Sequence, residues 1–378
     1  MQHKKIIRAA TIDWSIDFFR EVMILMREEG YDMIALTSPG EYLTQLNTKY
    51  GFRIIELPME RHISFLKDIK SLIKLVTVFR REKPLVVHSI TPKAGLLCML
   101  AARLTGVPIR IHTFTGLVWP TSIGVKRKLL MLTDKITCFC ATHIIPEGEG
   151  VKNDLQAYIT SKPMRVLGYG NVLGVDMDFW DPLRINVQKD EHVFQFLFTG
   201  RIVGDKGINE LVWAFVKLQK IYPSIRLMLT GSFERELDPL LPEIDKEIVS
   251  NDAIVVNGPF FGDDLVRLYA LADCFVMPSY REGFPNSVLE AGAMALPQIV
   301  TDINGSREII RNEINGLIVP AKDREALFHA MRRIYEDGSL RGKMSSHARE
   351  MISSRFERSF VQRCQIDYYN EILEGTNV

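Results

Sequence analysis

Short apolar runs alternate with amphipathic helical patterns along the first half of the chain. The run KIIRAATI precedes a helical pattern over 16–29 that stops at Gly30, and DMIALTS precedes another over 41–50. Strands that alternate with helices in this way form parallel sheets with helices on both faces. The pattern continues through FRIIELP, LVVHS, IRIHTF, THIIP and MRVLGYG. We therefore predict a Rossmann-like, doubly wound domain over residues 1–175.

A second series of the same kind comes after a polar interval at 181–191. Its apolar runs are VFQFLFTGR, IRLMLTG, AIVVNGP, DCFVMPS, PQIVTD and NGLIVP. We predict a second such domain over 176–378, and hence an α/β fold with two Rossmann-like, doubly wound domains facing across a cleft. Such sheets bind ligands beyond the carboxyl ends of their strands. The last helical pattern, at about 356–373, could belong to this domain or pack back on the N-terminal one.

Length and composition agree with two globular domains. A chain of 378 residues exceeds what one hydrophobic core usually supports, and 47% hydrophobic with 25% charged residues is ordinary for a globular enzyme. The formal net charge of +1 gives no overall attraction to nucleic acid, so no nucleic acid partner is expected.

Cysteine usage and hydropathy bear on the compartment. The five cysteines show neither zinc spacing nor a disulfide framework, and Cys138 and Cys140 alternate within an apolar run that favours buried packing. The segment Met1 to Lys5 and the short apolar run after it do not resemble a signal peptide, and no stretch reaches the roughly 18 uncharged apolar residues of a spanning helix. We expect a cytoplasmic protein, peripheral at most at the inner face of the plasma membrane.

The segment 200–207, GRIVGDKG, is the first candidate binding feature. It comes directly after a strand-like run, leads into a helix, and places Arg201 and Lys206 among three glycines. Glycines let backbone amides approach a ligand, and a helix N-terminus favours anions. The segment therefore predicts a diphosphate clamp, with a solvated loop as the alternative. No glycine lies in the segment 11–15 after the first strand, which argues against a nicotinamide dehydrogenase.

A spaced pair of glutamates is the second candidate feature. In REGFPNSVLEAGAMALPQIVTDINGSREII, Glu282 lies in the loop after the strand 275–279, and Glu290 lies in the helix expected over 286–294. A carboxylate accepts hydrogen bonds without donating, so the hydroxyls of a ribose and of a sugar are its natural complement. The structural alternative pairs Glu290 with an arginine and leaves Glu282 as a loop carboxylate.

These two features resemble the motifs of a known enzyme family. The segments 200–207 and 282–291 are similar to the signature of retaining nucleotide-sugar glycosyltransferases of the GT-B fold, family four. The segment 88–95, HSITPKAG, is similar to one in bacterial members that build capsule, O-antigen and other lipid-linked glycans. The resemblance covers nearly the whole chain.

The resemblance implies roles for the matching residues. Glu282, Arg201 and Lys206 would be catalytic: the two cations would hold the donor diphosphate and Glu282 the transferred sugar. Glu290 would hold the ribose. The implied donor-binding set is Gly200, Arg201, Lys206, Gly283, Phe284, Pro285, Asn286, Ser287 and Glu290. Such enzymes retain the anomeric configuration and are understood to work without a metal, so neither a metal nor another cofactor is expected.

The first domain departs from the family in one place. Many relatives carry Thr-x-His-Gly after the fifth strand, whereas this chain has Thr115 in the place of the histidine, with Gly116 after it. His112 is near in sequence, but side chains alternate along a strand, so it would point differently. The acceptor-side and cleft-lining candidates are therefore Asp13, Ser15, His88, Thr115 and Gly116, with a buried structural role equally open for His88.

The sequence Asp176-Met177-Asp178 has the form of a metal-binding motif from a different glycosyltransferase fold. Here it lies after Gly174-Val175 in the connection between the domains. We expect Asp176 to cap a turn or short helix, with metal binding as the less favoured alternative.

Two basic segments raise the question of a membrane surface. Lys126 to Lys128 precede the apolar run 129–132, and the stretch 61–83 combines lysines and arginines with a helical apolar pattern. Cations beside an apolar face suit an anionic leaflet. An ordinary amphipathic helix docked on the sheet explains the same pattern.

The sequence is thus interpreted as a cytoplasmic, metal-independent hexosyltransferase. The predicted partners are a nucleotide-sugar donor, most simply a UDP-sugar, and a lipid-diphosphate-linked saccharide of bacterial surface polysaccharide synthesis. Two rivals are a nucleotide-sugar-binding partner without catalysis, which the missing histidine motivates, and a GT-B-type sugar-nucleotide epimerase or phosphorylase.

Overall fold

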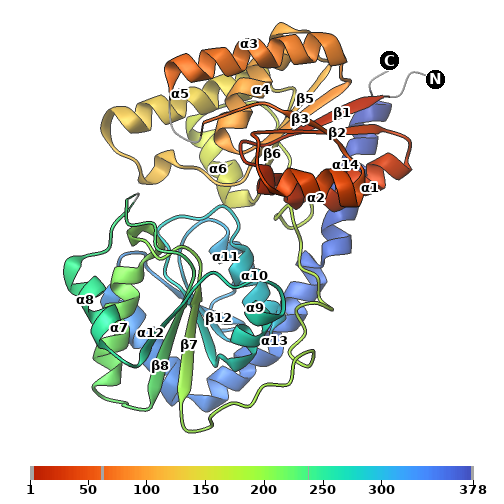
Figure 1. The fold of residues 1–378 in the computed structure, drawn as a ribbon. Coiled ribbons are helices and arrows are strands. Elements are labelled where there is room, and N and C mark those ends of the chain that lie inside the picture. The colour runs from red at the N-terminus through yellow and green to blue at the C-terminus, as the bar shows by residue number, and fades with distance from the viewer. Residues whose placement is uncertain (1–3, 61–63, 237, 376–378) are drawn as a thin grey trace. The chain divides into compact units, whose positions relative to one another are not determined.

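The computed structural model describes residues 4–60, 64–236 and 238–375 and divides the chain into two compact units (Figure 1). The first unit combines the residues up to Gly174 with those from Ser359 onward, and the second runs from Val175 to Arg358. Residues 1–3, which begin the segment tested for a signal peptide, and Arg61 of the second basic segment lie outside the described ranges.

The first unit is built on a parallel sheet of six strands. Its spatial order is β3-β2-β1-β4-β5-β6. The strands are β1 (Lys5–Ala9), β2 (Asp32–Thr37), β3 (Arg53–Glu56), β4 (Val86–Ile90), β5 (Ile109–Phe114) and β6 (His143–Pro146). The direction in which strands are added reverses between β1 and β4, as in doubly wound folds.

Helices cover both faces of this sheet. One core lies between the sheet and α3 (Phe65–Glu82), α4 (Pro92–Leu104), α5 (Gly124–Cys140) and α6 (Glu149–Tyr158). The other lies beneath η1 (Asp13–Phe19), α1 (Arg20–Glu28), α2 (Tyr42–Tyr50) and α14 (Arg358–Glu374). A short 3-10 turn, η2 (Trp119–Thr121), precedes α5. The C-terminal helix α14 is therefore part of the first unit's core, although it comes after the whole second unit in sequence.

The second unit repeats the design with the sheet order β12-β11-β10-β7-β8-β9. Its strands are β7 (Phe194–Thr199), β8 (Ile225–Thr230), β9 (Ile254–Asn257), β10 (Cys274–Met277), β11 (Gln298–Thr301) and β12 (Gly316–Val319). The helices are η3 (Gly204–Lys206), α7 (Ile208–Gln219), α8 (Pro242–Ser250), α9 (Gly262–Leu271), α10 (Asn286–Ala293), α11 (Ser306–Ile309), α12 (Arg324–Glu336) and α13 (Gly338–Phe356). Here the order reverses between β7 and β10.

The predicted fold class, two parallel sheets with helices on both faces, is confirmed. One predicted strand is wrong: MRVLGYG forms an irregular segment after α6. Its apolar run is interrupted by Gly168 and Gly170, whose φ angles of 57° and 95° break the extended backbone that a strand needs. Cys138 and Cys140 are buried, as predicted. No helix within the described ranges is long and apolar enough to span a bilayer.

Candidate functional site

The donor-site candidates of the second unit gather at the carboxyl ends of two neighbouring strands. The segment 200–207 comes after β7, the segment 280–287 comes after β10, and these two strands pair directly. They are also the strands between which the order of the sheet reverses. Ligands of doubly wound sheets bind at this switch point, because the loops leave in opposite directions and open a crevice. The topology thus brings together two motifs about 80 residues apart in sequence.

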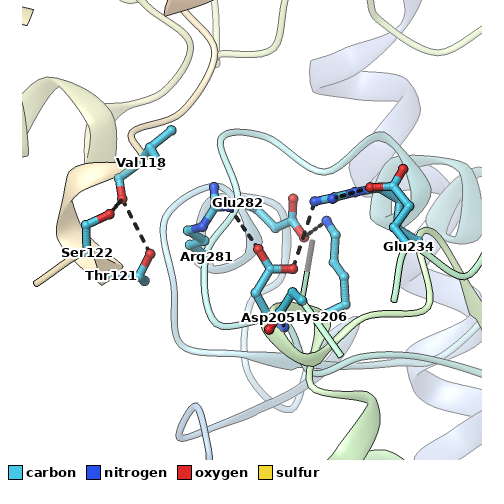
Figure 2. Close-up of polar contacts among 10 residues, drawn as sticks. Val118, Thr121, Ser122, Asp205, Lys206, Glu234, Arg281 and Glu282 are labelled. Atoms are coloured by element: carbon cyan, nitrogen blue, oxygen red, sulfur yellow. Dashed lines mark hydrogen bonds and ion pairs between the residues drawn. The ribbon is translucent and has the colours of Figure 1, made fainter. Parts of the chain in front are cut away.

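Lys206 and Glu282 meet across this switch point. The Lys206 ammonium donates a hydrogen bond to Glu282 Oε1, and Figure 2 shows the two side chains pointing toward each other. The Lys206 and Glu282 side chains are 15% and 14% exposed, so solvent screens this pair less than a surface ion pair. Glu282, predicted to bind the sugar, is therefore adjacent to Lys206, predicted to bind the diphosphate. A sugar diphosphate would need two such neighbouring groups.

A second ion pair holds the other predicted cation. Arg201 Nη1 donates to Glu234 Oε2 at 3.0 Å, and Glu234 comes from the loop after β8. Each predicted cation of the clamp therefore faces a carboxylate in the free protein. Binding of a diphosphate here would be an exchange in which phosphate oxygens replace Glu234 and Glu282 beside Arg201 and Lys206.

Asp205 joins the loops after β7 and β10. Its carboxylate accepts from Arg281 Nη2 at 2.8 Å (Figure 2). Its backbone oxygen accepts from the Tyr280 amide at 2.8 Å. The Asp205 amide in turn donates to the Asp238 carboxylate. Since Asp205 precedes Lys206 and Arg281 precedes Glu282, these contacts fix the backbone on both sides of the central ion pair.

Glu290 is the fifth residue of α10, in its second helical turn, is partly buried, and has a tyrosine as its partner. The Tyr269 hydroxyl donates to Glu290 Oε2 at 3.0 Å and lies 2.8 Å from Thr199 Oγ1 at the end of β7. Burial raises the pKa of Tyr269, so the hydroxyl keeps its proton. The arginine partner considered from the sequence is not the one found. A carboxylate has about four acceptor positions, so a single donor leaves room for hydroxyls of a ligand.

Burial also raises the pKa of Glu290, from an ordinary value of 4.5 to about 7. Between these pH values the folded protein holds a proton that the unfolded chain has released. The free energy of unfolding should therefore fall, by about 1–2 kcal/mol, as the pH rises from 4.5 to 7, because solvent at the partly buried group reduces the full linkage effect. Urea unfolding at a series of pH values between 4.5 and 7 measures this change in the free energy of unfolding. Glu290→Gln should lose that part of the slope, whereas an unchanged slope would contradict the assignment.

The loop 283–287 is shaped by buried contacts. Phe284 is buried and its ring lies 5.3 Å from that of Phe356, while Pro285 occupies the N-cap position of α10. The backbone amides of Asn286 and Ser287 then form the first turn of α10, where the positive end of the helix dipole favours an anion. Of the predicted donor set, Phe284 and Pro285 thus position the loop, and Asn286 and Ser287 present the amides.

Glycines allow the site loops to approach one another closely. A Cβ on Gly207 would lie 2.1 Å from the backbone oxygen of Pro278, and one on Gly231 would lie 1.9 Å from that of Gly200. Both glycines have positive φ, 71° and 145°. Without side chains at these positions the loops after β7, β8 and β10 can meet at the switch point.

Gly207→Ala is expected to lower the free energy of unfolding by about 2 kcal/mol or more, because left-handed strain and a backbone clash act together. Two controls separate these effects. Gly262 has a φ of 59° with no atom within 4 Å of an added Cβ, and Gly258 has neither strain nor neighbours. Chemical denaturation should show the largest loss in the free energy of unfolding for Gly207→Ala, a smaller loss for Gly262→Ala and the smallest for Gly258→Ala. Equal losses at Gly207 and Gly262 would show that the close approach is unimportant.

In the first unit, Asp13 and Ser15 lie after β1. Asp13 Oδ2 accepts from the Tyr42 amide at 3.0 Å, at the first turn of α2, and Ser15 is buried. Gly40 permits this contact, since a Cβ there would overlap the Asp13 carboxylate. In the free protein Asp13 therefore stabilises the start of α2, and a role for either residue toward an acceptor stays a prediction.

His88 lies inside the first unit, on β4. Its Nδ1 lies 2.7 Å from Arg8 Nη1 and 2.6 Å from the Tyr369 hydroxyl, and its Nε2 lies 2.7 Å from Thr113 Oγ1. Burial and the nearby Arg8 charge lower the pKa of His88 well below its ordinary value, so the ring is neutral. This is the environment of a buried, hydrogen-bonded histidine, and it links β1 and β4 to α14.

The segment after β5 holds the remaining candidates. His112 is buried on the strand, with Nδ1 2.8 Å from Ser89 Oγ and its ring against Gly95. Thr115 is half-buried just beyond the strand, and Gly116 has a φ of 115° that turns the chain away. His112 therefore faces Ser89 and Gly95 inside the first unit, and the acceptor-side role of Thr115 and Gly116 stays a prediction.

Asp176 caps a turn in the connection, as predicted. Its Oδ1 accepts from the amides of Asp178 and Phe179 at 3.1 and 2.8 Å, and its Oδ2 accepts from Arg358 Nη1 at 3.2 Å. Both oxygens are thus engaged within the second unit.

The sequence reasoning did not single out Asp205, Glu234 and Tyr269, which contact Arg201 or Glu290, nor Arg281, which contacts Asp205. Two had a signal, because Asp205 and Arg281 are charged and directly precede Lys206 and Glu282. Glu234 and Tyr269 had none, since they reach the site from the loop after β8 and from α9.

Comparisons with known proteins agree with this fold. Residues 18–170 match the family described as glycosyl transferase 4-like domain, and residues 181–351 match the family described as glycosyl transferases group 1. The crystal structure of Anabaena HepE in complex with UDP-glucose has a TM-score of 0.76, covers 98% of this chain and 100% of its own, and is 14% identical, so it shows a shared fold.

Two curated relatives are similar in sequence. The UDP-Gal:alpha-D-GlcNAc-diphosphoundecaprenol alpha-1,3-galactosyltransferase of Escherichia coli is 29% identical over 78% of both chains. The capsular polysaccharide biosynthesis glycosyltransferase CapM of Staphylococcus aureus is 32% identical over 99% of both chains. With matching family descriptions on both units and a relative of this identity over its full length, the chain belongs to the GT-B glycosyltransferases of the group 1, family-four type.

Proposed function

We propose that this glycosyltransferase transfers a hexose from a UDP-sugar, with retention of the anomeric configuration, to a saccharide linked to a lipid diphosphate. The product would be a precursor of a bacterial surface polysaccharide. The relatives named above support the donor and the acceptor, because one is a capsular enzyme and the other uses UDP-galactose and a diphosphoundecaprenol acceptor.

The observation that carries the proposal is the contact between Lys206 and Glu282 at the switch point, with Glu290 on the next helix, α10. Arg201 and Lys206 would bind the two phosphates, Glu290 the ribose hydroxyls, and Glu282 hydroxyls of the transferred sugar. These assignments give one group or pair of groups to each of the sugar, the diphosphate and the ribose of a nucleoside diphosphate sugar.

Catalysis would then rest on stabilising the leaving group. The bond between the anomeric carbon and the diphosphate oxygen breaks, the acceptor hydroxyl oxygen bonds to that carbon, and the hydroxyl proton passes to the departing phosphate. Cations and helix-terminal amides placed where negative charge develops lower the barrier, and one such donor is typically worth about a hundred- to a thousandfold in rate. The cations would be Arg201 and Lys206, and the amides would be those at the start of α10.

The test is a transfer assay on the purified chain. UDP-galactose, UDP-glucose and their N-acetyl analogues would be offered with a lipid-diphosphate-linked N-acetylglucosamine, in the presence of a chelator. Product formation with the donor's anomeric configuration, read by NMR coupling constants, is the expected result. An inverted product would contradict retention. Donor conversion without acceptor would identify an epimerase, a rate that depends on phosphate would identify a phosphorylase, and tight binding without turnover would identify a binding partner.

A further inference from the structure

Helix α3 of the first unit carries a second apolar stripe that is exposed among the described residues of its unit. Its buried residues are Ser71, Leu75, Phe79 and Glu82, and Leu75 and Phe79 belong to the core between this helix and the sheet. Phe65, Leu66, Ile69 and Ile73 lie on the other side of the helix and are strongly exposed, Leu66 at 84% and Ile73 at 62%. Docking of an amphipathic helix on the sheet therefore explains only part of the apolar pattern. Contiguous exposed apolar side chains of this size mark interaction surfaces.

Cations line this exposed stripe. Lys67, Lys70 and Lys74 recur at helical spacing beside it, and all three are exposed. The two acids of α3 face inward: Asp68 accepts from Lys93 Nζ at 2.5 Å, and the buried Glu82 accepts from Lys5 and Arg53. Lys67 forms an exposed ion pair with Glu60 at 2.7 Å, so the positive charge of the apolar outer face of α3 comes from Lys70 and Lys74.

Helix α5 repeats this composition on the same side of the sheet. Val125, Lys128, Leu132, Lys135 and Phe139 are all exposed and recur every three or four residues, so they form one stripe along the helix. The single acid of α5, Asp134, is only partly exposed. Helix α4 packs against both α3 and α5 within one core, so the two stripes flank it on one side of the first unit (Figure 1).

We propose that the outer faces of α3 and α5 form a docking surface for an anionic lipid bilayer. Apolar side chains at these positions would enter the boundary between headgroups and acyl chains, while the lysine ammonium groups stay with anionic headgroups. A second copy of the chain fits less well, because pairing two such faces would bring two rows of lysines together. The inference rests on exposure and charge alone and does not depend on the transferase activity.

The test is co-flotation of the full chain with vesicles of phosphatidylcholine, with and without phosphatidylglycerol. Binding is expected only with phosphatidylglycerol and should weaken at high salt, which screens the lysines. Lys70→Gln with Lys74→Gln should weaken it about 25-fold, since each cation near an anionic surface contributes about fivefold. Leu66→Gln with Ile73→Gln should weaken it at least about tenfold. Val249→Gln and Lys343→Gln, at exposed positions of the second unit, serve as controls.

The outcomes separate this proposal from the proposed function. Stabilisation by UDP, measured as a thermal shift, should be the same in the parent and in the lipid-binding variants, which also shows that they are folded. A parent that ignores phosphatidylglycerol vesicles, or variants that bind them equally well, would overturn the docking surface even if sugar transfer is demonstrated. Dimerisation of the parent in sedimentation velocity, abolished in Leu66→Gln with Ile73→Gln, would assign the face to contacts between copies instead.

Discussion

Glu290→Gln is expected to weaken the binding of both uridine and UDP, each by about a hundredfold. Hydrogen bonds to a charged group contribute about 1.5–3 kcal/mol, which corresponds to about 10- to 150-fold in affinity. Above its pKa of about 7 Glu290 carries a negative charge that ribose hydroxyls would contact. A glutamine keeps the shape of the side chain and one acceptor for the Tyr269 hydroxyl, but it lacks this charge. Since the ribose is common to both ligands, both affinities should fall together. Isothermal titration calorimetry at about pH 8, where most of Glu290 is ionised, measures the two dissociation constants directly.

The matched control is Glu243→Gln, which changes an exposed glutamate of α8. It should leave both affinities unchanged. Unchanged affinities in folded Glu290→Gln would show that this carboxylate has only a structural role beside Tyr269. A loss confined to UDP would instead move Glu290 from the ribose to the diphosphate.

Lys206→Met is expected to lower turnover by about a hundred- to a thousandfold. It should also weaken the binding of UDP and leave the binding of uridine unchanged. The ammonium would face the diphosphate, whose negative charge grows as the sugar departs, and uridine has no phosphate for it to contact. This pattern is the opposite of that expected for Glu290, so the two variants together place the two ends of the nucleotide. Release of UDP from the donor in the presence of acceptor measures turnover.

Removal of the lysine also leaves Glu282 without its partner, and an unpaired, largely buried carboxylate is destabilising by itself. The double variant Lys206→Met with Glu282→Gln removes that cost and should restore stability but not turnover. Lys217→Met, in an exposed ion pair with Glu325 on the same unit, is the control for loss of a lysine. Turnover that survives in the folded double variant would contradict a role for this pair in the reaction.

Much of the architecture could be predicted from the sequence. Apolar runs separated by helical patterns identified strands such as β7 and β10, and the glycines and charges at their ends marked the segments 200–207 and 282–290. These are local signals, since a buried parallel strand needs a continuous apolar run and a close loop needs glycine. The exception, the run at 164–170, shows that a local apolar run is not sufficient where glycines prevent an extended backbone.

The partners of the charged groups could not be predicted, because they depend on which strands become neighbours. Nothing local to Glu290 indicates that Tyr269 of α9 will contact it, and nothing local to Arg201 indicates Glu234. The same applies to the outer face of α3. Leu66, Ile69, Leu72, Ile73 and Val76 form one periodic pattern in sequence, yet Leu72 and Val76 pack against the core and the other three are exposed. Which part of a wide apolar face is covered depends on the rotation of the helix about its own axis when it packs on the sheet.

The contribution of α14 to the first unit has a consequence for synthesis of the protein. Tyr369 forms hydrogen bonds with the buried Arg8 and His88. It emerges from the ribosome only after the whole second unit has been synthesised. At about 5–20 residues per second, translation of the intervening segment takes roughly 10–40 s. During this interval the nascent first sheet lacks one of its covering helices and exposes apolar surface to chaperones, whereas the second unit has all its residues as soon as the interval ends. Premature termination before α14 would therefore leave a complete second unit attached to an incomplete first one, a product suited to removal by cellular proteases.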